Sequence, residues 1–528
     1  MLRNRFYKDV FKAFLVICLI LGLCRVTLGG AAALVAVLGV FFALLRKPGY
    51  MAVCYIMFPL FTIFNRTIVG LSPVFLMTAR FGNLLMILAM LLTGAGFQGR
   101  AREHLPLGWM FAYCIVACFS SIDGWMPMIS FLKIAQFILF ILGLLMVGRV
   151  IQASDRGLYQ LRCAFMAMAI IFILGSFAAR FIPSVGYSMT FANAQAYGYE
   201  MTIEDYMAYE GVRLLNGMTC HSQMLAPTVA IMATWVLCDM LLVERRLTVL
   251  HTCLLAISPI LLFMSRSRGG FLVMVVVLLT VILVCVPRAR LSAFVKGKLF
   301  RLLFLGAVLL VGVALVAQMR NQTISKWLRK TENVGGDTRS LREAFTASRQ
   351  GLVEMNLRDF KLNPLLGKGF QVMPGMKQAY RAKMITWYSA SVEKGVTPYV
   401  ILGETGVVGA IVFVCFLISF YGTCLRRRYL ALLTSFTCVL VANLADSTLF
   451  SPGGQGGFLW IVACVGAFST DLIAIRQAHR SPSLGTRPYG GMAFSPVFPP
   501  PGIPFPPPRT SRPQPGVSFQ PSGRPLGR

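Results

Sequence analysis

Apolar runs of about twenty residues, repeated along most of the chain, constrain its fold more than any other feature. Each run is long enough to cross a bilayer as a helix. Of the 528 residues, 57% are hydrophobic and only 13% are charged, far below the roughly 25% of charged residues in soluble domains. We therefore predict an all-α polytopic transmembrane helix bundle of about 11–14 spans. The first predicted span begins near Phe11, and the others lie near 29–45, 51–65, 74–93, 107–122, 128–148, 161–182, 223–243, 247–264, 269–287, 301–318, 396–422, 430–447 and 456–475.

The Lys and Arg residues gather in alternate short connections between these runs. Those connections lie at 46–47, 100–102, 149–156, 245–246, 288–301 and 426–428. The intervening connections near 121–125 and 447–457 are almost free of Lys and Arg, and the one at 183–222 carries acidic residues. The positive-inside rule therefore places the basic connections and both termini in the cytoplasm. Topology and anionic membrane lipid explain most of the net charge of +31, so we predict no nucleic-acid partner.

The fourteen cysteines lie almost all inside apolar runs. No CxxC or Cys/His spacing typical of a metal site occurs among them. We interpret them as small core residues and predict no metal site.

Three places on the predicted outer side are basic although topology does not require it. They are Arg213, the pair Arg266 and Arg268 in SRSRGG, and the long segment 318–395, which includes Arg339. Guanidinium groups gathered at one membrane face suit a phosphate or pyrophosphate. The long segment is predicted to fold as short helices that cap the bundle, and the alternative is a solvated surface domain with ordinary Lys and Arg.

Five short motifs then occur in order: RLLNGMTCHSQMLA (213–226), SRSRGG (265–270), GDTRSLREA (336–344), NPLLGKGF (363–370) and GETGVVGAIVF (403–413). This combination resembles the O-antigen ligase and Wzy-type polymerase superfamily of bacterial membrane proteins. The resemblance covers roughly 210–475, whereas the first 200 residues match only as a hydrophobic bundle.

The resemblance implies transfer of a glycan from undecaprenyl pyrophosphate to an acceptor sugar, at the outer face of the inner membrane, in O-antigen or exopolysaccharide assembly. It implies no nucleotide sugar and no cofactor. Family arginines are thought to hold the pyrophosphate, and Arg213, Arg268 and Arg339 occupy the matching positions, with Arg266 beside them. In GKGF, Gly367 and Gly369 would let the backbone approach a ligand closely.

One departure from the family pattern concerns the general base. Family ligases carry a His-Asn pair about nine residues before the glutamate of E-x-G-x-x-G, and this chain has Gly395 and Val396 there. Either Glu393 or Glu404 serves as base, or no base is needed because pyrophosphate is a good leaving group. The departure favours a polymerase or a divergent relative over a lipid A ligase.

His221 and Glu404 each have two interpretations. His221 lies in the outward segment, where it could reach a cavity lined by Arg213 and act in proton transfer, or it could be a cap or interface residue. Glu404 could be catalytic, or it could pair with an arginine inside the bundle.

The sequence divides into three predicted parts. These are N-terminal transmembrane helices at 1–200, a ligase- or polymerase-like membrane domain at 201–475 that includes the external loop 318–395, and a disordered Pro-rich cytoplasmic tail at 476–528. The PxxP-like spacing of the tail could recruit a protein partner, or the tail could lie as a basic segment near anionic lipid.

Two other function classes stay open at this point. A flippase or exporter of lipid-linked oligosaccharide would also need a basic cavity for pyrophosphate, but it should show internal repeats and charge along a whole transmembrane path. A noncatalytic membrane scaffold organised by the tail is the third class.

Overall fold

The computed structural model describes residues within the first 480 positions of the chain. They are 2–27, 30–45, 47–69, 73–94, 104–152, 154–186, 215–220, 222–246, 248–265, 270, 272–276, 280, 341–374, 395–445 and 447–480. Residues 1–480 belong to one compact unit, and residues 481–528 are outside it. The predicted division near residue 200 and the predicted tail stay predictions.

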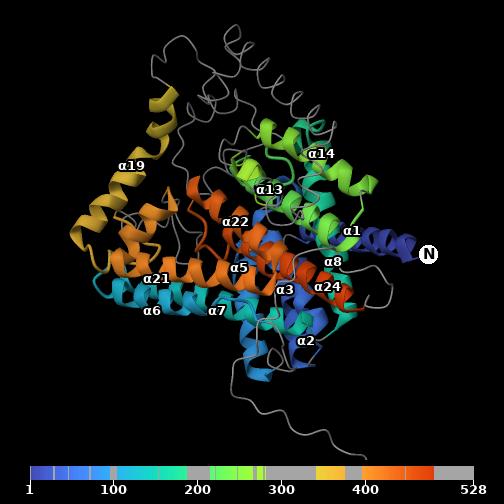
Figure 1. Ribbon diagram of the computed structural model, residues 1–528, viewed down its shortest axis with the longest axis horizontal. Helices are drawn as coiled ribbons and strands as arrows, with labels where there is room; N and C mark the ends of the chain where they lie inside the picture. The colour runs from blue at the N-terminus through green and yellow to red at the C-terminus, as the bar shows by residue number, and fades with distance from the viewer. Residues whose placement is uncertain are drawn as a thin grey trace, which may run out of the picture. The chain divides into compact units, whose positions relative to one another are not determined.

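All regular elements among these residues are helices (Figure 1). The first half contains α1 (Leu2–Val26), α2 (Gly30–Leu44), α3 (Pro48–Ile63), α4 (Arg66–Val69), α5 (Pro73–Thr93), α6 (Gly108–Ile122), α7 (Pro127–Gln152), α8 (Asp155–Ala169), η2 (Ile170–Gly175), α9 (Ser176–Ala179) and α10 (Pro183–Gly186). The second half contains α13 (Ser222–Cys238), η3 (Asp239–Glu244), α14 (Val249–Met264), α19 (Leu341–Leu362), α21 (Thr397–Arg427), α22 (Leu430–Ala445), α23 (Gln455–Ile461), η4 (Val462–Ala467) and α24 (Phe468–Arg480).

The elements labelled η are π-helical turns inside longer helices. α8 continues through η2 into α9, α13 continues into η3, and α23 continues through η4 into α24. Such turns often occur at functional sites because they re-aim the side chains they carry. Here η3 begins with Asp239, whose carboxylate accepts from Arg162 of α8.

Five described helices are long and apolar enough to cross a membrane, by length and composition. They are Pro127–Val150, Asp155–Ala179, Gln223–Glu244, Thr397–Arg427 and Gln455–His479. Shorter apolar helices accompany them at Gly30–Leu44, Tyr50–Ile63, Leu84–Thr93, Gly108–Ile122, Val249–Met264 and Leu430–Leu444. The predicted all-α polytopic bundle is confirmed, while the predicted spans at 269–287 and 301–318 lie largely or wholly outside the described residues.

Large apolar side chains occupy both the interior and the outer surface of the bundle. Trp235 and Trp460 are fully buried in the core. Leu19 of α1, Phe41 of α2 and Ile418 of α21 are exposed. Water would disfavour such a surface, whereas hydrocarbon accommodates it.

Local sequence explains where several helices begin and end. Ser154 caps α8, because its Oγ accepts from the amide of Gly157 at 3.2 Å. α21 ends at Arg427, where Arg428 takes a left-handed conformation (φ 59°). The positive charges of Arg426 and Arg427 lie at the negative end of the α21 dipole, which is a favourable interaction.

Connections that the charge pattern assigns to the cytoplasm meet at one end of the bundle. Arg476 of α24 donates to the Asp155 carboxylate and, at 2.6 Å, to the carbonyl of Gln152. The Asp471 carboxylate accepts from the amides of Ala431 and Leu432, each at 2.9 Å, at the start of α22. These contacts join the connections after α7 and α21 to two places on α24.

Connections assigned to the outer side meet in the same way. The amide of Trp125, in the turn between α6 and α7, donates to the carbonyl of Lys368 at 3.1 Å. The side-chain amide of Gln371 donates to the carbonyl of Phe450, between α22 and α23. Helix α6 packs against both α7 and α21, and α19 packs on α21 (Figure 1). Which end faces the cytoplasm stays a prediction.

Candidate functional site

The helix α21 is interrupted at Gly406, inside the GETG motif. Gly406 has φ 63° and ψ −162°, a conformation that is essentially restricted to glycine. In an unbroken helix the amides of Val407 and Val408 would donate to the carbonyls of Gly403 and Glu404. They donate instead to the carbonyls of Pro364 at 2.9 Å and Leu365 at 3.2 Å.

The two carbonyls freed by this break find partners in the same loop. Gly403 accepts from the amide of Lys368 at 2.9 Å, and Glu404 accepts from the amide of Gly369 at 3.2 Å. Residues 364–369 therefore insert into the hydrogen-bond ladder of α21 and replace two helical bonds with four of their own. We call residues 364–371 the inserted loop. The motifs NPLLGKGF and GETG, which are separate in the sequence, form one structural unit.

Glycines make this insertion sterically feasible. A Cβ on Gly367 (φ 74°) would lie 2.4 Å from the carbonyl carbon of Glu404, and one on Gly406 would lie 2.3 Å from that of Leu365. A Cβ on Gly369 (φ 106°) would lie 3.2 Å from the Cα of Gly124. The close backbone approach predicted for Gly367 and Gly369 is present, and its partners here are α21 and the α6–α7 turn. Contact of either glycine with a ligand stays a prediction.

Glu404 faces the inserted loop from α21 and is buried. Its Oε1 accepts from the amide of Gln371 at 2.9 Å, and Gln371 has a left-handed backbone (φ 54°). The hydroxyl of Ser120 donates to the Glu404 carbonyl. Glu404 thus holds its neighbours through both its side chain and its main chain.

Serines on α6 and α7 bind the same loop from the other side. The Ser120 Oγ accepts from the amide of Gly369 at 3.0 Å, and the Ser121 Oγ accepts from the amide of Phe370 at 3.4 Å. The Ser130 hydroxyl donates to the Phe370 carbonyl at 2.8 Å. Sequence reasoning missed these serines, because hydroxyl residues near the end of an apolar span give no signal of a distant partner.

The turn between α6 and α7 also reaches α19. The indole Nε1 of Trp125 donates to Oδ1 of Asp359 at 3.2 Å, and Asp359 is buried. This contact fixes the last turns of α19 beside the loop. The described part of the predicted external segment is thereby joined to α6, α7 and α21.

The break in α21 lies close to the end of an apolar span. Residues 407–425 after it are apolar, and the first charged side chain is Arg426. A helix of this length covers about 30 Å, close to the thickness of the hydrocarbon core. By this length argument we expect residues 397–406 to extend beyond the hydrocarbon, with Gly406 and the inserted loop near the membrane boundary.

The structure describes only some of the predicted site residues. Glu404, Gly367 and Gly369 lie together as described above. The others are outside the described residues: Glu393, His221, Arg213, Arg266, Arg268 and Arg339. Their predicted roles stay predictions.

Gly270, which follows Arg266 and Arg268 in the sequence, lies near the start of α13. A Cβ on Gly270, which ends the SRSRGG motif, would lie 2.3 Å from the Cβ of Ala226. The side-chain amide of Gln455 donates to the carbonyl of Met224 at 3.3 Å. The connection from Phe450 to Gln455 thus contacts both the start of α13 and the inserted loop.

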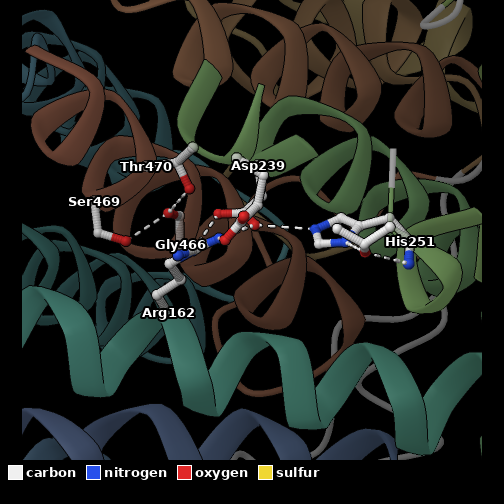
Figure 2. Close-up of polar contacts among 8 residues, drawn as sticks. Arg162, Asp239, His251, Gly466, Ser469 and Thr470 are labelled. Carbon is white, nitrogen blue, oxygen red and sulfur yellow. Dashed lines mark hydrogen bonds and ion pairs between the residues drawn. The ribbon is translucent and has the colours of Figure 1, made fainter. Parts of the chain in front are cut away.

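A second buried polar cluster joins α8, η3 and α14 (Figure 2). The Arg162 guanidinium donates from Nε to Oδ1 of Asp239 at 2.7 Å and from Nη2 to Oδ2 at 2.9 Å. Nη2 also donates to Oε1 of Glu244 at 2.5 Å. The Nε2 of His251 lies 3.1 Å from Oδ2 of Asp239, and its Nδ1 lies 2.6 Å from the Thr248 hydroxyl.

These charges are paired within the cluster, which suits a structural tie between helices. Arg162 also lies over the ring of Phe6, 4.3 Å from its centroid, which joins α1 to the cluster. This cluster was not predicted from the sequence. Among the residues that the structure covers, no group of three His, Cys, Asp or Glu side chains could hold a metal ion.

Part of the chain is similar to a known protein family. Residues 251–414 match the family model described as O-antigen ligase. The match contains most of α14, all of α19, the inserted loop and the GETG break, so it includes both halves of the interlocked unit. No curated protein matches the chain. The match supports a glycan ligase or polymerase role, and the resemblance of this membrane protein to the O-antigen ligase and Wzy-type polymerase superfamily is confirmed through residues 251–414.

Proposed function

We propose that this protein transfers an oligosaccharide from undecaprenyl pyrophosphate to an acceptor sugar at the outer face of the bacterial inner membrane. The observation that carries the proposal is the loop inserted into α21 at Gly406. It lies within the family match and near the membrane boundary, where the headgroup of a lipid carrier would also lie.

The chemistry needs a nucleophile and a stabilised leaving group. A hydroxyl oxygen of the acceptor attacks the anomeric carbon of the donor, a new glycosidic bond forms, and the bond to the pyrophosphate oxygen breaks. The lipid pyrophosphate leaves with the bonding electrons. Positively charged groups that already face the leaving oxygens lower the barrier.

We propose that arginines supply this positive charge without a metal. The predicted residues are Arg213, Arg266, Arg268 and Arg339. The proton of the attacking hydroxyl passes to Glu393, His221 or Glu404, or to the departing pyrophosphate. The arginines and the proton acceptor are sequence predictions, and the family match supports the class of reaction to which they belong.

The same family match favours a transferase over the predicted alternative, a flippase or exporter. Between the two transferases, the absence of the His-Asn pair before Glu404 favours a polymerase. Both termini are proposed to face the cytoplasm, as the distribution of Lys and Arg predicts.

The glycan profile of cells that carry variants tests the proposal. The variants are Arg213→Ala, Arg268→Ala and Arg339→Ala, and Arg426→Ala, at the opposite end of α21, is the matched control. Membrane expression is checked for each. We expect the three site variants to lose transfer and the control to keep it.

The pattern of loss separates the two transferases. Chains reduced to single repeat units, with accumulated lipid-linked donor, identify a polymerase. Long chains that persist on the carrier and never reach an acceptor identify a ligase. A wild-type profile in all three well-expressed site variants would end the transferase proposal.

A further inference from the structure

We propose that Glu404 is a positioning residue, whose carboxylate holds the backbone of the inserted loop and does not take the proton of the acceptor hydroxyl. The proposal rests on the transferase function proposed above. It rejects the catalytic interpretation of Glu404, and the carboxylate holds a backbone amide where the sequence suggested an arginine.

The first step is the hydrogen bond to Gln371. The Oε1 of Glu404 accepts the Gln371 amide at 2.9 Å, and Gln371 is buried with φ 54°. A residue other than glycine adopts this conformation only when its surroundings impose it. The carboxylate supplies one such constraint, since a buried amide without an acceptor is strongly disfavoured.

The second step is the main chain of the same residue. The Glu404 carbonyl accepts from the amide of Gly369 at 3.2 Å and also from the Ser120 hydroxyl. Glu404 therefore binds Gly369 through its carbonyl and Gln371 through its side chain. The residue between them, Phe370, is fixed from both sides.

The third step concerns what this fixation positions. The Phe370 ring packs against Phe450, Phe137 and Tyr113, with centroid distances of 5.7, 6.1 and 6.4 Å. These rings belong to α6, α7 and the connection between α22 and α23. Holding Gly369 and Gln371 thus sets the Phe370 ring among three separate parts of the bundle. Glu404 acts on the site through this loop.

The last step is access. A general base must lie within about 2.6–3.2 Å of the hydroxyl whose proton it takes. The Glu404 side chain is 2% exposed, and its Oε1 points at the loop backbone. Taking a proton from a sugar hydroxyl would require the loop to move away, which would undo the contacts that define the site. Glu393, His221 or the pyrophosphate itself then receives the proton.

Substitutions at Glu404 separate the two roles. Glu404→Gln keeps an oxygen that can accept the Gln371 amide but removes the basic carboxylate, whereas Glu404→Ala removes both. Glu354→Gln, an exposed position on α19, controls for the loss of one negative charge. We measure glycan transfer from the lipid-linked donor by the full-length protein in membranes, over a range of pH.

We expect Glu404→Gln to keep transfer within about threefold of wild type, with the same pH profile, and Glu404→Ala to lose about tenfold or more. Loss of transfer in Glu404→Gln equal to that in Glu404→Ala, with the loop still protected, would overturn the proposal. If Glu404→Ala does not accumulate, the activity and pH profile of Glu404→Gln decide the question alone.

Hydrogen exchange of peptides that cover 364–374 gives a readout that does not need the reaction. We expect Glu404→Ala to lose protection there and Glu404→Gln to retain it. Unchanged protection in Glu404→Ala would refute the positioning role. If the wild type does not transfer glycan at all, the proposed function fails, and the exchange experiment still decides the role of Glu404.

Discussion

Replacing Gly406 with alanine perturbs the interlocked loop at its most constrained point. Gly406 has φ 63° and ψ −162°, and an added Cβ would lie 2.3 Å from both the carbonyl carbon and the oxygen of Leu365. The substitution therefore opposes both the break in α21 and the presence of the loop within it. The polarity and charge of the site do not change.

The structure gives the scale of the effect. The backbone conformation costs an alanine about 1–3 kcal/mol. The overlap with Leu365 costs about 1–3 kcal/mol more, because a backbone segment has to shift. Against this, the four backbone hydrogen bonds of the loop contribute about 0.5–1.5 kcal/mol each. The penalty is thus comparable to what holds the loop in place.

Two measurements on the purified full-length protein check this estimate. Hydrogen exchange in 364–374 should become faster by about thirtyfold or more, which corresponds to roughly 2 kcal/mol. Glycan transfer should fall with it. Gly422→Ala is the matched control, because Gly422 lies in the same helix with open space around its Cβ position. Wild-type exchange in Gly406→Ala would refute the inserted-loop account.

Three further predictions concern regions away from the loop. Arg162→Ala removes the bidentate partner of the buried Asp239 carboxylate. It should lower the free energy of unfolding by about 3–5 kcal/mol, measured as a lower melting temperature in detergent. Asp471→Ala removes the acceptors of the Ala431 and Leu432 amides and should cost about 1–3 kcal/mol, measured in the same way, with glycan transfer retained at low temperature. Deletion of 481–528 should leave glycan synthesis intact, and loss of synthesis on deletion would favour the scaffold function.

The sequence predicted the features that depend on local composition. Apolar runs located the helices because hydrocarbon selects for length and hydrophobicity alone. The contacts of Arg476 with Asp155 and of Trp125 with Lys368 each join connections that the alternation of basic and uncharged connections assigns to the same side. Both signals are carried by residues close together in the chain.

The break in α21 was not predicted, and its physical basis explains why. The predicted span 396–422 runs through Gly406 without a sign of interruption, because glycine is common inside transmembrane helices. The insertion is made by backbone amides and carbonyls of 364–369 and 403–408. Every residue type except proline carries both groups, so they leave no signal in the sequence. The glycines are the only sequence signal of the insertion, and the same glycines would equally suit close contact between the backbone and a ligand.

The Arg162 cluster was missed for a related reason. Arg162 follows a basic connection, so the positive-inside rule accounts for it without a partner. Its partners Asp239 and Glu244 lie about 80 residues away, on another span. Pairing across that separation requires knowledge of which helices are neighbours.

The inserted loop also bears on how a pyrophosphate could be recognised. Glycine-rich loops often bind phosphate through free backbone amides. In this chain the amides of 367–371 all donate to the protein: to Asn363, Gly403, Glu404, Ser121 and the Glu404 carboxylate, in that order. The amides of Val407 and Val408 at the break are occupied as well. Since these backbone donors are already used, we expect a pyrophosphate at this site to be held by side chains, such as the proposed Arg213, Arg268 and Arg339. We therefore expect the arginine variants to lose glycan transfer while hydrogen exchange in 364–374 stays unchanged.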